Sequence, residues 1–145
     1  MKKIFFILIV LSTIITGCTN DKELQDTQRP LTITTNASDN EIIERSEMIS
    51  DGVVELYGID DAASIILNDE VLIGVRVAYD EKLKEETITS IESKVKTLDE
   101  NISKIYITDK SKQFNEINNI ITEILQGESY ESFIPDIDNL KNRMK

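Results

Sequence analysis

The side chains available for chemistry in this sequence are carboxylates, lysines, arginines, tyrosines and hydroxyls, because it has no histidine and a single cysteine. A Ser/His or Cys/His nucleophile pair and an imidazole metal site are therefore excluded, as are an internal disulfide and a thiolate cage. Carboxylates gather at Asp60-Asp61 and at Asn68-Asp69-Glu70, and oxygen ligands of this kind can hold Ca²⁺. The neighbouring Glu85 and Glu86 could act as an acid and a base.

Neither group of carboxylates has the spacing of an established site. The loop carboxylates do not match the EF-hand loop, so an acidic turn in water is the better interpretation. Neighbouring residues on a helix do not face each other, so Glu85 and Glu86 are better explained as charged surface. We therefore predict no catalytic residue, no metal and no cofactor.

Cys18 follows an apolar segment near the start of the chain. Lys2 and Lys3 precede a stretch from Ile4 to Ile15, which is too short to span a bilayer because that needs about 20 apolar residues. This order is typical of an export signal. Ile15-Thr16-Gly17-Cys18 resembles the bacterial lipobox, so we expect cleavage before Cys18 and a diacylglyceryl thioether, with fatty chains such as palmitate, on its sulfur. The alternatives are an unmodified cysteine and an uncleaved signal anchor.

The predicted cleavage divides the chain into a lipoprotein signal peptide at 1–17, a lipidated Cys18 with a flexible tether at 18–37, and a single domain at 38–145. The net charge of the whole chain is -11, and cleavage makes it -13 because Lys2 and Lys3 are removed. This negative charge argues against nucleic acid as a partner, because a phosphate backbone binds basic surfaces. It also repels an anionic membrane surface, so the acyl chains must supply the membrane attachment. A short strand at Leu31 to Thr35 is the competing interpretation of the tether.

Apolar periodicity predicts the elements of the folded part. We expect a helix from Ser38 to about Tyr57, strands at Ala62–Leu67 and Val71–Tyr79 with a turn at Asn68 and Asp69, a helix at Glu81–Leu98, a strand at Ile102–Thr108, a helix through Phe114 that ends near Gly127, and a short last helix that begins at Pro135. Gly52 could end the first helix, but the apolar face continues in register across it, so we favour a continuous helix.

These elements predict an α+β fold, a small two-layer sandwich in which a three-stranded sheet has helices on one face. In the second strand the core face holds Val71, Ile73, Val75, Val77 and Tyr79, and the open face holds Leu72, Gly74, Arg76 and Ala78. We predict that Arg76, Lys104 and Tyr106 form a contact surface on the open face, for a partner protein or a second copy. The order of elements is similar to the BON domain and to the ring-building motif, which bind or oligomerise.

Three segments resemble the YhcN/YlaJ-type sporulation lipoprotein family: Leu56 to Ala62, the hairpin from Asn68 to Val75, and Ile102 to Thr108. The ending from Phe133 to Met144 also looks like the last helix of that family. The resemblance implies a lipid-anchored protein on the extracytoplasmic face of a spore membrane, with a part in germination or outgrowth and no established activity.

We therefore predict a non-enzymatic, membrane-tethered module that binds an unknown protein partner or associates with itself. The alternative is a small envelope hydrolase or ligand-binding lipoprotein that works through carboxylates. A deep pocket with convergent carboxylates would favour the alternative, and a filled core with an exposed apolar patch would favour the contact module.

Overall fold

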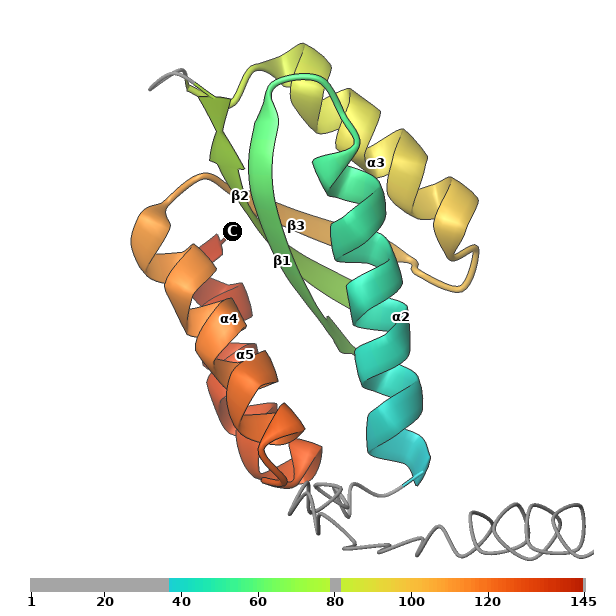
Figure 1. Ribbon diagram of the computed structural model, residues 1–145, viewed down its shortest axis with the longest axis vertical. Helices are drawn as coiled ribbons and strands as arrows, with labels where there is room; N and C mark the ends of the chain where they lie inside the picture. The colour runs from blue at the N-terminus through green and yellow to red at the C-terminus, as the bar shows by residue number, and fades with distance from the viewer. Residues whose placement is uncertain (1–36, 79–81, 145) are drawn as a thin grey trace, which may run out of the picture. The chain divides into compact units, whose positions relative to one another are not determined.

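The computed structural model describes residues 37–78 and 82–144, which form four helices and three strands. In chain order these are α2 (Ala37–Val54), β1 (Ile59–Leu67), β2 (Glu70–Val77), α3 (Glu85–Leu98), β3 (Lys104–Thr108), α4 (Ser111–Leu125) and α5 (Tyr130–Met144) (Figure 1). The predicted α+β class and the predicted order of elements are confirmed. The predicted signal peptide, Cys18, and the tether with its competing strand lie outside the described residues.

The three strands form one mixed sheet with β2 in the centre. β1 and β2 are antiparallel, and Leu67 pairs with Glu70, so the hairpin turn consists of Asn68 and Asp69 as predicted. Asn68 has a left-handed φ of 60°, which asparagine tolerates better than most residues. β2 and β3 are parallel, and α3 supplies the crossover between them.

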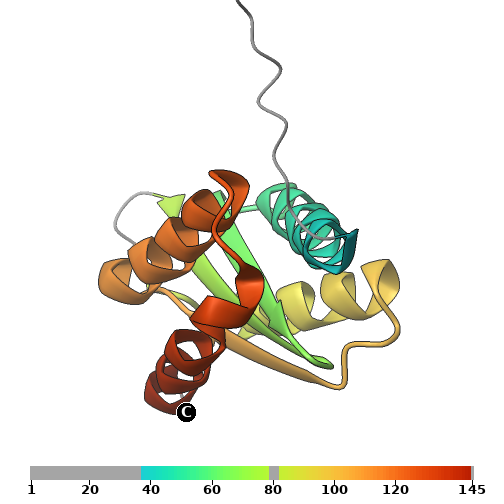
Figure 2. The same cartoon turned by 90° about the horizontal axis from the view of Figure 1, so that it is seen from below.

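Helices cover both faces of this sheet, as Figure 2 shows. On one face, the buried side chains of α2 and α3 join those of the strands in a cluster that includes Ile49, Val53, Ile66, Val71, Ile73, Val75, Ile91 and Val95. On the other face, the buried side chains of α4 and α5 pack with those of the strands in a second cluster. It includes Ile65, Leu67, Leu72, Tyr106, Phe114, Ile117, Ile124, Ile137 and Leu140. The prediction that helices cover one face is therefore wrong.

The central strand explains the second covered face. Leu72, which we placed on the open face, is 0% exposed, and Gly74 beside it is buried. A Cβ added to Gly74 would lie 2.8 Å from the Cα of Phe114, so the glycine lets α4 lie directly against the strand. Leu72 and Tyr106 are buried on this face, because the apolar stripes of α4 and α5 pack against them.

Three helix boundaries differ from the prediction. α3 begins at Glu85 rather than at Glu81. α2 passes through Gly52 as expected but ends at Val54 rather than near Tyr57, because a turn with a left-handed Gly58 (φ 86°) follows it. α5 begins at Tyr130 rather than at Pro135, which lies inside the helix. The earlier start buries the ring of Tyr130. Across the ranges that the structure describes, no helix is long and apolar enough to cross a membrane.

Candidate contact surfaces

Arg76 is held against the amino-terminal half of α4. Its guanidinium carbon lies 4.2 Å from the centroid of the Phe114 ring, a cation–π contact. The guanidinium also donates to Oδ2 of Asp61 and to Oδ1 of Asn115, each at 3.2 Å. Arg76 therefore reaches the surface while joining β1, β2 and α4.

Lys104 and Tyr106 lie in a polar cluster beside α5. Tyr106 is 7% exposed, and its hydroxyl donates to Oε1 of Glu70 at 3.2 Å. Lys141 of α5 donates to Oε2 of the same carboxylate at 2.8 Å, and the Lys104 ammonium lies 5.1 Å from the centroid of the Tyr106 ring. The hydrogen bond from Lys141 lowers the pKa of Glu70. The cluster fastens α5 to the sheet.

The three residues predicted as a contact surface therefore do not share an open sheet face. That face lies beneath α4 and α5, so its predicted exposure is wrong. The structure brings Lys104 and Tyr106 together, whereas Arg76 lies beyond Gly74, the last residue of β2 that pairs with β3. Contact of Arg76 or Lys104 with a partner stays a prediction.

The carboxylates weighed above as chemical sites lie in separate places. Asp61 pairs with Arg76, and Asp69 accepts a hydrogen bond from the hydroxyl of Ser103. Glu85 and its neighbour are exposed in the first turn of α3. Among the residues that the structure describes, no three carboxylates are grouped so that they could hold a metal ion.

Exposed apolar side chains lie along α2 and in the turn that follows it. Met48 and Val54 are each 40% exposed, and Tyr57 is 102% exposed. Sequence analysis missed Met48 and Val54 because it followed the buried stripe of α2. The signal was present, since Met48 and Val54 are apolar residues outside that stripe.

A groove of about 420 Å³ lies between α2 and α3. Its lining consists of Glu44, Glu47, Met48, Asp51, Gly52, Glu55, Lys94 and Leu98. Glu44, Glu47 and Asp51 come from α2, at spacings of three or four residues that place them on one side of the helix. Glu55 lies in the turn that follows α2. Lys94 donates to Glu55 at 2.7 Å, and this hydrogen bond lowers the pKa of Glu55. A Cβ added to Gly52 would collide with Leu98, so the glycine allows the close approach of α3.

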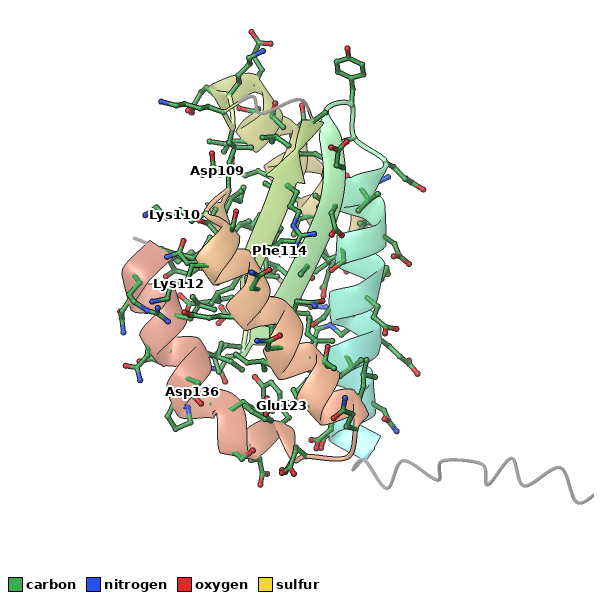
Figure 3. All side chains as sticks on the ribbon, turned by 60° about the vertical axis from the view of Figure 1, so that its left-hand side comes forward. Asp109, Lys110, Lys112, Phe114, Glu123 and Asp136 are labelled. Carbon is green, nitrogen blue, oxygen red and sulfur yellow. The ribbon has the colours of Figure 1, made fainter. Side chains whose placement is uncertain are left out.

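A second hollow, of about 350 Å³, lies between α4 and α5. Glu123 and Asp136, labelled in Figure 3, line it from the two helices. Arg143 of α5 donates to Glu116 of α4 at 3.1 Å within the same lining. An internal ion pair thus balances part of the negative charge of this hollow.

One family model matches this sequence over nearly its whole length. The model is described as Sporulation lipoprotein YhcN/YlaJ, and it matches residues 16–145. The match includes Cys18 and every helix and strand named above, and it confirms the resemblance drawn from the sequence. No curated protein matches the sequence. The chain belongs to the sporulation lipoprotein YhcN/YlaJ family.

Proposed function

We propose that this protein is a non-enzymatic contact module of the spore, tethered to a membrane by a lipid on Cys18. It binds a protein partner or a second copy of itself and acts in germination or outgrowth. Membership of a lipoprotein family supports the lipid anchor, and the lipobox-like Ile15-Thr16-Gly17-Cys18 supports Cys18 as its site. Two acyl chains suffice for stable attachment, so the acidic body needs no attraction to the membrane surface.

The exposure of Tyr57 carries this proposal. The turn beneath it is fixed by a hydrogen bond from the N–H of Ile59 to the carbonyl of Leu56. An aromatic ring that stays in water adds no burial energy to the fold, whereas tyrosine is enriched among the residues that dominate binding at protein interfaces. Met48 and Val54 of α2 are also exposed, each at 40%. Binding of a partner that covers these side chains would be stabilised by the removal of their apolar surface from water.

Photo-crosslinking from position 57 of the full-length chain tests the proposal. In spore membranes we expect one defined protein adduct, because the side chain would lie inside an interface. The same crosslinker at Asn118, which is exposed on α4, is the control and should give little of that adduct. Cys18→Ala should release the protein from the membrane fraction or leave it unprocessed, and the adduct should then disappear.

Tyr57→Ala separates contact from folding. Because Tyr57 is fully exposed, we expect the free energy of unfolding to change by less than about 0.5 kcal/mol. We expect the partner to be lost from complexes extracted in mild detergent. Equal adducts from positions 57 and 118, or full recovery of the partner with Tyr57→Ala, would refute contact through this surface.

A further inference from the structure

We propose that the groove between α2 and α3 binds a basic amphipathic segment of a partner protein. Lysine or arginine side chains of the segment pair with the carboxylates of α2, and an apolar side chain of the segment packs on Met48. This inference rests on the contact function proposed above and specifies the chemistry of the partner. The charge of the groove, the spacing of its carboxylates and its apolar surface carry the argument.

Most carboxylates of the groove lack a partner within the described part of the chain. Glu44, Glu47 and Asp51 form no ion pair with any residue of 37–78 or 82–144. Arg45, on the same helix, donates instead to Asp99 at 2.7 Å. The groove therefore presents negative charge that these residues of the chain do not neutralise.

This arrangement of carboxylates lowers the stability of the helix that carries it. Glu44 and Glu47 are three residues apart in α2, and Asp51 lies four residues after Glu47. Like charges at these spacings destabilise a helix by about 0.2–0.5 kcal/mol for each pair, or about 0.4–1 kcal/mol for the two pairs together. Proteins commonly give up stability of this size at surfaces that bind a partner. A cationic partner would convert the repulsion into attraction.

The form of the groove favours a peptide segment over a metal ion. Glu44, Glu47 and Asp51 are spread along about 10 Å of helix, and no three carboxylates of the described residues are grouped to hold a metal. Met48, which is 40% exposed, and Leu98 add apolar surface that a hydrated ion could not use. A segment with basic residues three or four positions apart and apolar residues beside them matches both features.

The test uses the full-length lipidated protein in vesicles of neutral phosphatidylcholine. The probe is a soluble peptide of about 14 residues, with lysines three or four positions apart and leucines along one side. The groove variant combines Glu44→Gln, Glu47→Gln and Asp51→Asn. The control variant combines Glu123→Gln, Glu131→Gln and Asp136→Asn, which removes the same charge from exposed positions of α4 and α5. Vesicles without protein provide the blank.

We expect the peptide to bind the wild type and the control variant alike, and to bind the groove variant at least tenfold more weakly. Raising the salt concentration from about 20 mM to about 300 mM should weaken binding to the wild type, because salt screens exposed charges. The groove variant should also unfold at a higher temperature than the wild type, since the repulsion has been removed. Weaker binding by a more stable variant excludes misfolding as the cause.

Three results would overturn the inference. The first is that both variants weaken peptide binding equally, and the second is that the peptide does not bind the wild type. The third is a change in the sedimentation of the protein which shows that the groove binds a second copy of the chain. Crosslinking from position 57 judges the contact function separately. If a protein adduct forms from position 57 but the peptide does not bind, the proposed contact function is supported and only the proposal of a basic partner segment is refuted.

Discussion

Tyr130 is a single side chain whose burial makes the stability of the fold depend on alkaline pH. Its hydroxyl donates to the carbonyl of Ile66 at 2.7 Å. Burial raises the pKa of Tyr130 from 10.0 to about 12, and the charge of Asp39 adds to the effect. The folded protein thus favours the neutral phenol. The resulting stability is complete below pH about 10 and is lost as the pH rises from about 10 to about 12.

Tyr130→Phe should remove this dependence. Across that pH range we expect the wild type to lose about 2 kcal/mol more of its unfolding free energy than the variant loses, because the variant has no phenol to ionise. Urea titrations of both proteins at each pH measure the difference. Every other ionisable group is the same in both proteins, so its contribution cancels in the comparison. Parallel profiles would contradict the burial of this hydroxyl.

The polar cluster around Glu70 illustrates how far residue spacing predicts a site. Alternation along β3 placed Lys104 and Tyr106 on the same side of the strand, and the structure confirms this. Glu70, which accepts the hydroxyl of Tyr106, lies 36 residues from it in sequence, and Lys141 lies 71 residues from Glu70. Spacing within one element carries no information on partners so distant, so the burial of Tyr106 was not predicted.

Gly74 controls how closely α4 approaches β2. An added Cβ would meet the backbone of Phe114, which cannot move without shifting the helix. We expect Gly74→Ala to lower the unfolding free energy by about 1–3 kcal/mol. Gly52→Ala is the matched control, because its Cβ meets the flexible end of Leu98 and alanine favours the helix, so its effect should stay below about 1 kcal/mol. Thermal unfolding compares the two, and equal losses would contradict a special role for Gly74.

Helices and strands were predictable from apolar periodicity, but their layers were not. β2 carries consecutive apolar residues from Val71 to Ile73, a pattern typical of a strand buried on both faces. We interpreted one face as open because each predicted helix has only one apolar stripe, and we placed Gly74 and Arg76 on that face. The structure shows that both residues contact Phe114, the glycine by leaving room for the helix and the arginine by lying over the ring. The pattern of apolar and polar residues along the strand predicts neither contact.

Three ion pairs hold different parts of the folded body together. They are Arg45–Asp99, between α2 and the loop before β3, Lys141–Glu70, between α5 and β2, and Arg143–Glu116, between α5 and α4. Their members lie 54, 71 and 27 residues apart in sequence, so local patterns could not predict them. The pairing with arginine and lysine lowers the pKa of Glu116 and of Glu70. These junctions between elements are therefore held by paired charges, whereas Glu44, Glu47 and Asp51 of the α2 groove form no ion pair within the described residues.

Asp99 is the most buried carboxylate of these pairs, with 5% of its side chain exposed. Burial by itself would raise its pKa, but hydrogen bonds from Arg45 and from the N–H of Asn101 outweigh burial and lower the pKa. A carboxyl with a lowered pKa contributes stability above its unfolded pKa, about 4, and loses that contribution as the pH falls through the folded value. Acid should therefore loosen the connection between α2 and the loop before β3.

Asp99→Asn should reveal this acid-sensitive connection. At neutral pH we expect the variant to be less stable than the wild type by about 1–3 kcal/mol, because Arg45 loses its charged partner while remaining partly buried. Below pH about 4 the difference should shrink, since the wild type then protonates Asp99 and loses the same interaction. Asp51→Asn, which changes an exposed carboxylate on α2, is the control and should not lower stability at neutral pH. A difference between Asp99→Asn and the wild type that stays constant from neutral to acidic pH would mean that the charge of Asp99 does not join these elements.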